Sequence, residues 1–148
     1  MKQSNINGFN ESQIFQLYAY VVAYEDSGIV RYESTKAMLK EHPELSEVEK
    51  VVRMVRLRNA KYETMKDVDF KTLQNEVYHT KSKGNMLLSF LAHLRNSIAH
   101  GGAVEYQGSV LITDFEPPKY HPVYFTARGC VTFSTINDIT KILKNIIL

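Results

Sequence analysis

Apolar residues recur every three or four positions along much of the chain, and this spacing places them on one face of an α-helix. The clearest stripe is Leu87–Ile98, and the following Gly101-Gly102 pair is typical of a helix end. A second stripe predicts a first helix over about 11–25. Its apolar positions are Ile14, Leu17, Tyr18, Val21 and Val22.

Three further segments between these two stripes favour helices. They cover about 34–40, 45–62 and 69–78, and the first of them ends before Pro43, because a residue that precedes proline avoids helical backbone angles. The 45–62 segment has its apolar positions at Val48, Val51, Val52, Val55 and Tyr62.

Cap residues indicate where some of these helices begin and end. Asn10 precedes the first helix as a candidate N-cap, and Gly28 follows it as a stop signal. Ser46 with Glu49 three residues later has the spacing of a capping box.

After Gly102 the period changes to the alternation that is typical of β-strands. Two pairs of short strands are expected, joined by Gly108-Ser109 and by Arg128-Gly129. The strands are 104–107 with 110–113, and 123–127 with 130–133. Apolar residues from Ile136 to Ile146 then predict a closing helix, capped by Ser134 or Thr135.

The expected fold class is therefore mainly α. It is a helical bundle with a small antiparallel β insertion, about 104–133, before the C-terminal helix. The 148 residues favour one domain over 1–148.

Composition narrows the class of protein only a little. Hydrophobic residues make up 44% of the chain and the net charge is +2, which is ordinary for a globular protein and low for a dedicated duplex-binding domain. The single cysteine, Cys130, excludes an internal disulfide, and we expect it to be a small core or edge residue. No apolar run is long enough to cross a membrane, so we expect a cytoplasmic location and no membrane partner.

The sharpest chemical signal is the run Arg-Asn-Ser-Ile-Ala-His over residues 95–100. Asn96 and His100 are one helical turn apart and share a face, and the long side chain of Arg95 can reach the same space. Histidine can move protons near neutral pH, arginine binds phosphate through a planar fork, and asparagine can orient either one. This trio suits a reaction in which a phosphate gains charge while a hydroxyl loses a proton. RNA supplies both groups.

A purely structural explanation fits the same residues. A histidine in the last turn of a helix is favourable against the helix dipole, and Gly101 is the expected residue beyond a helix end. Arg95 could simply pair with a carboxylate.

The run over 95–100 resembles the Arg-(four to six residues)-His motif of HEPN domains, the higher eukaryotes and prokaryotes nucleotide-binding domains. In that family the residue after the arginine is often Asn, Asp or His, and here it is Asn96. The resemblance implies a helical bundle and, for many members, a metal-independent RNase that resembles toxins of toxin–antitoxin and phage-defence systems. Such proteins dimerise so that two motifs share one cleft. The expected β insertion departs from the minimal bundle.

The resemblance implies Arg95, Asn96 and His100 as catalytic residues of an endoribonuclease. His100 would act as general base on the 2′-hydroxyl or general acid on the leaving oxygen, and Arg95 would stabilise charge on the phosphate. One imidazole does not easily do both tasks, so a second His100 from a homodimer is attractive. No cofactor or metal is required, and the partners are RNA and an antitoxin protein.

Other residues are weaker candidates for RNA binding. They are His93, Lys81, Lys83, Tyr120 and Arg128. His93 is more often a partly exposed helix residue in such a position. A zinc site built from His79, His93 and His100 lacks an evident further ligand.

Two other classes of protein stay open. One is a non-catalytic HEPN-like module that binds RNA, a nucleotide or a partner protein. The other is a helical interaction protein with no nucleic-acid role. Two His100 side chains facing one basic cleft would favour the enzyme, whereas a monomer with Arg95 in a salt bridge and His100 capping its helix would favour the interaction protein.

Overall fold

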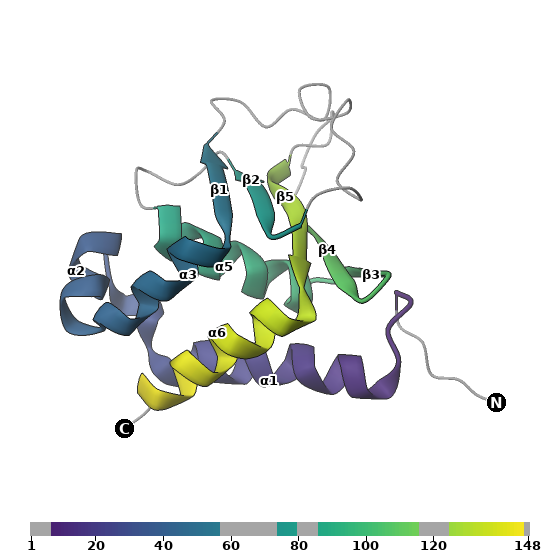
Figure 1. Ribbon diagram of the computed structural model, residues 1–148, viewed down its shortest axis with the longest axis horizontal. Coiled ribbons are helices and arrows are strands. Elements are labelled where there is room, and N and C mark those ends of the chain that lie inside the picture. Colours follow the sequence, from purple (N-terminus) through teal and green to yellow (C-terminus); the bar gives the residue numbers. More distant parts are fainter. Residues whose placement is uncertain (1–6, 57–73, 80–85, 116–124, 147–148) are drawn as a thin grey trace.

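The computed structural model describes residues 7–56, 74–79, 86–115 and 125–146. Helix α5 (Met86–Ala99) packs against a β-sheet, and α1 (Glu11–Ser27) packs against α5 and runs beside α6 (Phe133–Ile146) (Figure 1). Shorter helices follow α1 at one end of the molecule: η1 (Ile29–Arg31), α2 (Thr35–Glu41), η2 (Pro43–Leu45) and α3 (Ser46–Val51). Within the described residues, no helix is long and apolar enough to cross a lipid bilayer.

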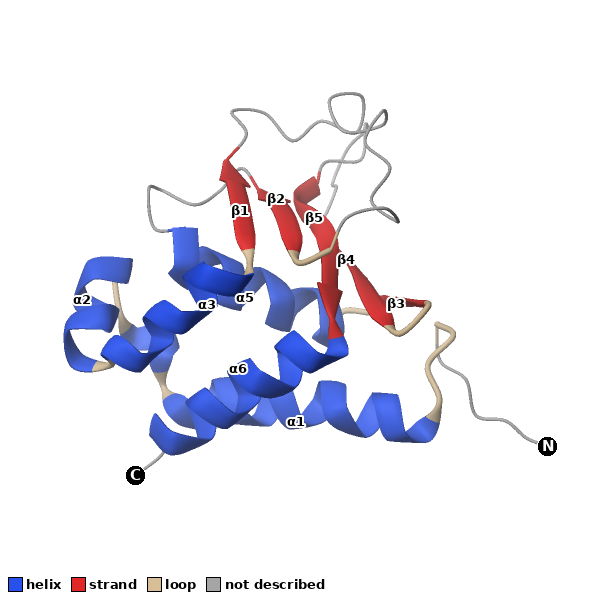
Figure 2. Cartoon of the chain, in the orientation of Figure 1, coloured by secondary structure: helices blue, strands red, loops and turns tan. Residues whose placement is uncertain are grey.

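The sheet has five strands in the order β1-β2-β5-β4-β3 and fills the upper half of the molecule in Figure 2. Its strands are β1 (Arg53–Arg56), β2 (Glu76–His79), β3 (Val104–Tyr106), β4 (Ser109–Phe115) and β5 (Phe125–Thr132). β1 and β2 are parallel, and the other pairs are antiparallel. The expectation of a mainly helical bundle with a small antiparallel insertion over 104–133 is therefore wrong, and the fold is mixed α/β.

Two predicted helices contributed to that error. The helix predicted over 45–62 ends at Val51 and is followed by β1, and Glu76, Val77 and Tyr78 of the helix predicted over 69–78 belong to β2. Positions 57–62 and 69–73 of these predictions lie outside the described residues. The valines at 51, 52 and 55 have a spacing that is compatible with a helix. Valine is branched at Cβ, however, and this favours a strand. Parallel pairing between β1 and β2 decides the outcome, and no local pattern reveals a partner more than twenty residues away.

The predicted turn at Arg128-Gly129 is also wrong, because β5 is one continuous strand. Gly129 lies opposite Val77 on β2 and Ile112 on β4. A Cβ built on Gly129 would collide with the backbone oxygen of Glu76 and lie 2.6 Å from the Cα of Val77. The glycine therefore allows close approach of a neighbouring strand, a role that glycine also serves inside sheets.

Several elements follow the sequence closely. Asn10 caps α1 in a capping box with Gln13, and Gly28 ends α1 in the left-handed conformation at φ 70°. Ser34 caps α2, whereas Ser46 is the first residue of α3 and makes no side-chain cap. The cap of α6 is Thr132, whose hydroxyl accepts from the amide of Thr135, so the expected cap at Ser134 or Thr135 is displaced.

The buried face of α1 differs from the predicted stripe. Leu17, Tyr20 and Ala23 are buried, and the hydroxyl of Tyr20 donates to the carbonyl of Leu91 on α5. Tyr18 and Val22 were expected in the core, yet they are 61% and 56% exposed. Because α1 is apolar on more than one face, periodicity alone does not say which face meets α5 and α6.

Gly129 provides a direct test of the sheet register. Gly129→Ala should lower the free energy of unfolding by about 1–3 kcal/mol, because its Cβ has no room against β2. The measurement is urea unfolding followed by circular dichroism. Val104→Ala on the half-exposed edge strand β3 serves as the control and should cost less. Equal stability of Gly129→Ala and wild type would contradict the pairing of β5 with β2.

Candidate functional site

The polar motif lies where α5 ends against the sheet. Helix α5 ends at Ala99, and the amide of His100 still donates to the carbonyl of Asn96 at 2.9 Å. Gly101 then adopts φ 79°. The amide of Gly102 donates to the carbonyl of Ser97 at 2.7 Å, and the carbonyl of Gly102 accepts from the amide of Thr113 on β4 at 3.0 Å. The end of the helix is thereby fixed to β4. His100 is exposed, and its ring makes no hydrogen bond to the part of the chain that the structure describes.

Arg95 is held from two sides. Its Nε and Nη2 donate to the carboxylate of Glu25 on α1 at 3.1 and 2.7 Å, and its Nη1 donates to Oδ1 of Asn96 at 3.1 Å. The Arg95 and Glu25 side chains are 29% and 47% exposed, so this ion pair lies at the surface. A guanidinium has five donors, and three are used in these contacts.

Asn96 connects the arginine to a buried carboxylate. Its amide nitrogen donates to Oδ2 of Asp114 on β4 at 3.2 Å, and the same oxygen lies 2.8 Å from Nδ1 of His93. A carboxylate only accepts hydrogen bonds, so Nδ1 of His93 is the donor. Asp114 and His93 are each 7% exposed. The chain of contacts thus leads from the buried sheet through Asn96 to Arg95 at the surface.

The register of the sheet explains how His93 reaches Asp114. Asp114 pairs with Ala127 on β5, and Ala127 pairs with His79 on β2, so the three residues form one row across the sheet. Side chains in such a row point to the same face. The small side chain of Ala127 leaves room above the middle strand for the imidazole of His93. The rings of His93 and His79 meet edge to face, with centroids 5.5 Å apart.

His79 has an unusual environment for a histidine. It is fully buried, and neither ring nitrogen has a hydrogen-bond partner among the described residues. Burial, with smaller contributions from His93 and Arg56, lowers the pKa of His79 to about 4. The imidazole is therefore neutral at physiological pH.

The structure separates the predicted RNA-binding residues. His93 is buried against Asp114 and is not the partly exposed helix residue that was expected. Arg128 follows Ala127 in β5, so alternation directs it to the sheet face away from α5. Lys81, Lys83 and Tyr120 lie outside the described residues. Cys130 is buried as expected, and burial raises the pKa of its thiol.

Sequence reasoning missed Asp114, His79 and Glu25. A signal for Asp114 was available in the alternation along its strand. Asp114 lies on the same side of the strand as Val110 and Ile112, which are core residues. An acid in a core-facing position needs a partner. No comparable signal marked His79, since it was assigned to a polar loop that follows the predicted helix over 69–78.

No group of three or more metal-binding side chains comes together within the described ranges. The rings of His79 and His93 are in contact, and Asp114 is engaged by His93 and Asn96.

Comparison with known proteins identifies the family. A family model described as HEPN pEK499 p136 matches residues 1–125, which is most of the chain. The chain belongs to this HEPN family, and the recognition made from the sequence is confirmed at that level. Most of β5 and the whole of α6 follow the matched residues. No curated protein and no solved structure gives a significant match.

The buried His79 should make stability depend on pH. The unfolded chain binds a proton near pH 6.5 and the folded chain only near pH 4, so stability is fully present above 6.5 and falls as the pH decreases toward 4. The total loss from this group is about 3 kcal/mol. Urea unfolding between pH 4 and 7 measures it. His79→Leu should flatten the slope, whereas the exposed His100→Ala should keep it; an unchanged slope in His79→Leu would contradict the assignment.

Removing the buried carboxylate should destabilise the protein. Asp114→Ala leaves Nδ1 of His93 and the amide of Asn96 without their acceptor, at a cost of about 3 kcal/mol in the free energy of unfolding. Thr113→Ala, next to it on β4, is the matched control and should cost less than about 1 kcal/mol. Equal losses in the two variants, measured by urea unfolding, would contradict the role given to Asp114.

Proposed function

We propose that this HEPN protein is a metal-independent endoribonuclease of toxin–antitoxin or phage-defence type that acts in the cytoplasm as a homodimer. The observation that carries the proposal is the grouping of Arg95, Asn96 and His100 at the end of α5, with His100 exposed and its ring free of described partners. Family membership supports the proposal, because HEPN domains are often RNases or nucleotide-binding modules.

In the proposed reaction, His100 removes the proton from the 2′-hydroxyl of a ribose. The freed oxygen attacks the adjacent phosphorus, and the bond from phosphorus to the 5′-oxygen of the next nucleotide breaks. A protonated imidazole, supplied by His100 of a second copy, gives its proton to that leaving oxygen. The products are a 2′,3′-cyclic phosphate and a 5′-hydroxyl.

Arg95 stabilises the negative charge that develops on the phosphate oxygens. Its guanidinium direction is set by Asn96, whose own orientation is set by Asp114. Asn96 was expected to orient either the histidine or the arginine, and its described side-chain contacts are with Arg95 and Asp114. Asp114 is therefore a positioning residue in this proposal, since it acts on the phosphate only through Asn96 and Arg95.

Glu25 bears on this proposal because it already occupies two donors of Arg95. An incoming phosphate has to displace the Glu25 carboxylate or use the remaining donors of the guanidinium. The surface pair is weak, worth about 0–1 kcal/mol, so a doubly hydrogen-bonded phosphate competes with it.

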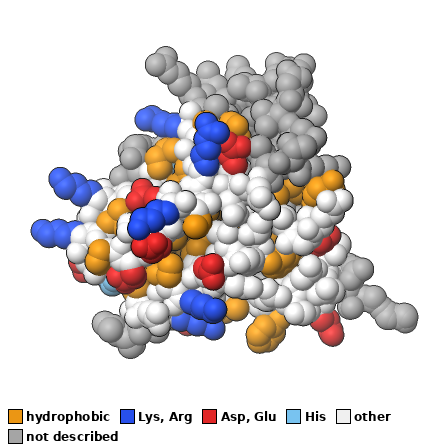
Figure 3. All heavy atoms as spheres, in the orientation of Figure 1, with side chains coloured by type: hydrophobic (Ala, Val, Ile, Leu, Met, Phe, Trp, Pro, Cys, Tyr) orange, Lys and Arg blue, Asp and Glu red, His pale blue; other side chains and the backbone are white. Residues whose placement is uncertain are grey.

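The second candidate function is a non-catalytic module that binds RNA, a nucleotide or a partner protein. One observation favours it, because Arg95 is already engaged by Glu25. Figure 3 shows one face of the molecule, and acidic and basic side chains are mixed on its described part. The intact pair of Arg95 and His100 favours catalysis over this alternative.

Cleavage of RNA by the purified protein in EDTA tests the enzyme directly. Wild type should cut RNA and leave cyclic phosphate ends, while His100→Ala and Arg95→Ala should lose about 100-fold or more in rate. His42→Ala, a histidine change away from the motif, is the matched control and should keep the wild-type rate. Equal rates in wild type and His100→Ala, or 3′-hydroxyl ends, would contradict the mechanism.

Expression in bacteria provides the corresponding test of the toxin role. Wild type should slow growth, and either motif variant should relieve that effect. Equal growth inhibition by wild type and both motif variants would contradict it.

A further inference from the structure

An anion from the chain itself already occupies one edge of the Arg95 guanidinium. Nε and Nη2 of Arg95 both donate to the same oxygen, Oε1 of Glu25, at 3.1 and 2.7 Å. Paired donors of this kind are the means by which arginine binds the oxygens of carboxylates and phosphates. The Glu25 carboxylate therefore marks the place where a phosphate oxygen can bind, and it lies on the side of Arg95 that faces α1.

The same side of α1 carries an aromatic ring. Tyr18 and Glu25 are seven residues apart, which is two helical turns, so they project from one side of α1 about 10.5 Å apart along the helix. Tyr18 lines a small hollow with Ile98 and Gly101 at the end of α5. Ile98 and Arg95 are three residues apart and share a side of α5. The two helix sides thus face each other, with the cation near one end and the ring near the other.

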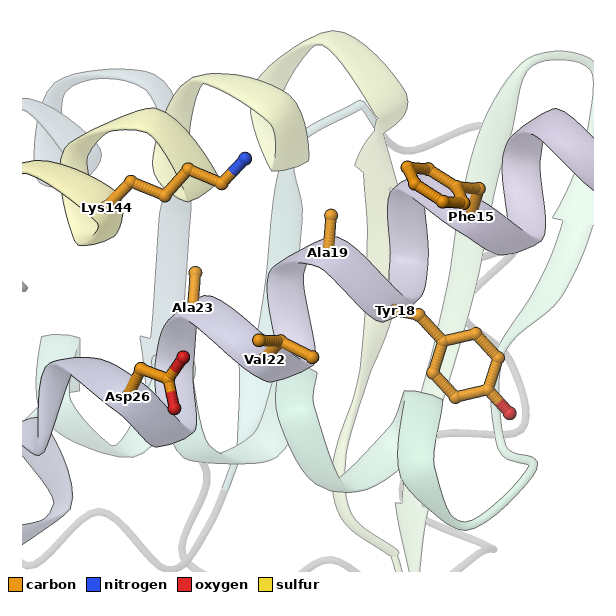
Figure 4. Close-up of a pocket in the computed structure, with 7 residues that line it drawn as sticks. All are labelled: Phe15, Tyr18, Ala19, Val22, Ala23, Asp26 and Lys144. Carbon is orange, nitrogen blue, oxygen red and sulfur yellow. The ribbon is translucent and has the colours of Figure 1, made fainter.

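The ring of Tyr18 is open to a ligand. Tyr18 is 61% exposed, and in Figure 4 its ring lies on the side of α1 away from Lys144, whereas Phe15 points toward the Lys144 side. The hollow beside the ring measures about 70 Å³. It is too small to enclose a ligand, because pockets that do so begin at about 300 Å³. A ligand that uses this ring therefore lies flat on it.

We propose that Tyr18 stacks one base of a single-stranded RNA, while a neighbouring phosphate of that strand replaces the Glu25 carboxylate on Arg95. Proteins that bind single strands stack bases on exposed aromatic rings, and every base offers a flat face for this contact. Val22, which is 56% exposed, lies between the two contacts and meets the sugar. Tyr18 is a binding residue in this account and moves no proton. The inference rests on the proposed function only in that Arg95 receives a phosphate of RNA.

The combination of the two contacts favours a nucleic acid over a protein segment. A protein segment would cover the exposed ring, but it has no need of the guanidinium edge on the same side. A nucleotide carries an anionic phosphate and a flat aromatic base on one sugar, so it can use both. A base inside a duplex is already stacked and paired, and the site therefore selects unpaired RNA.

Fluorescence anisotropy with a labelled single-stranded RNA tests the stacking contact. The full chain carrying His100→Ala is the parent, because this change should prevent cleavage of the probe. Adding Tyr18→Ala should raise the Kd roughly tenfold, the effect of losing one stacked base, whereas Tyr18→Phe keeps the ring and should stay within about twofold. Circular dichroism should show the same fold in each variant, because residue 18 is exposed.

Phe15→Ala is the matched control for this measurement. It removes another exposed ring of α1, on the side toward Lys144, and should bind RNA as the parent does. A parent that binds no RNA, or an equal loss in Phe15→Ala and Tyr18→Ala, overturns the proposal. An unchanged Kd in Tyr18→Ala also overturns it and leaves the exposed ring to a protein partner.

An abasic strand of the same length separates base stacking from a structural role of Tyr18. This strand keeps the sugars and phosphates and lacks the bases, so Tyr18→Ala should leave its Kd unchanged. If Tyr18→Ala weakens binding of the abasic strand as much as binding of the RNA, the ring does not stack a base and the proposal is overturned.

Glu25→Gln tests whether the carboxylate holds the place of a phosphate. Removing the competing charge should lower the Kd for RNA by about threefold, as expected for a surface ion pair. Glu11→Gln makes the same change in net charge near the start of α1 and should have a smaller effect. Binding by Glu25→Gln that is no tighter than binding by Glu11→Gln overturns this part of the proposal.

Cleavage is measured separately in chains that retain His100, so that the two proposals can fail independently. Tyr18→Ala should raise KM and leave kcat nearly unchanged, because a remote base contact contributes mainly to binding. Binding that depends on Tyr18 in a protein that cuts no RNA would support the stacking contact and count against the enzyme. Cleavage with an unchanged KM in Tyr18→Ala would overturn the stacking contact and leave the enzyme intact.

Discussion

The buried carboxylate of Asp114 is the contact on which the arrangement of this protein depends. A charge in the interior is tolerated only with hydrogen-bonding partners, and Asp114 finds two of them on α5, His93 and Asn96. These bonds fix the rotation of α5 over the sheet. They also determine where Arg95 emerges at the surface, because Asn96 accepts from its guanidinium. A residue of strand β4 thus sets the positions of Asn96 and Arg95 on helix α5.

The contact between Asp114 on β4 and the motif helix α5 means that the site depends on the sheet as well as on the helices. The sheet supplies Asp114, which orients the motif through Asn96. The small Ala127 on the middle strand β5, opposite Asp114, leaves space for His93, which hydrogen-bonds to Asp114. The hydrogen bond from the amide of Thr113 to the carbonyl of Gly102 fixes the end of α5 to the same strand as Asp114. The residues that follow the helix therefore belong to the architecture of the site. They are more than the flanking insertion that was expected.

What the sequence could predict depended on whether the relevant signal was local. The caps Asn10 and Gly28, the stripe over Leu87–Ile98 and the motif at its end are encoded within a few residues. The family was recognised from that motif. Strands β1 and β2 were missed because pairing across the sheet decides their structure. The exposed side of α1 was assigned to the core, since a helix that is apolar on more than one side does not indicate which side is covered.

The central claim is that Arg95, Asn96 and His100 act on a phosphate attacked by its own neighbouring 2′-hydroxyl. Cleavage of one RNA oligonucleotide in EDTA, compared with the same oligonucleotide carrying a single 2′-deoxynucleotide at the position that is cut, tests this most directly. The account predicts that the all-RNA strand is cut and the substituted strand stays intact at that position. Equal cleavage of both strands there would contradict it.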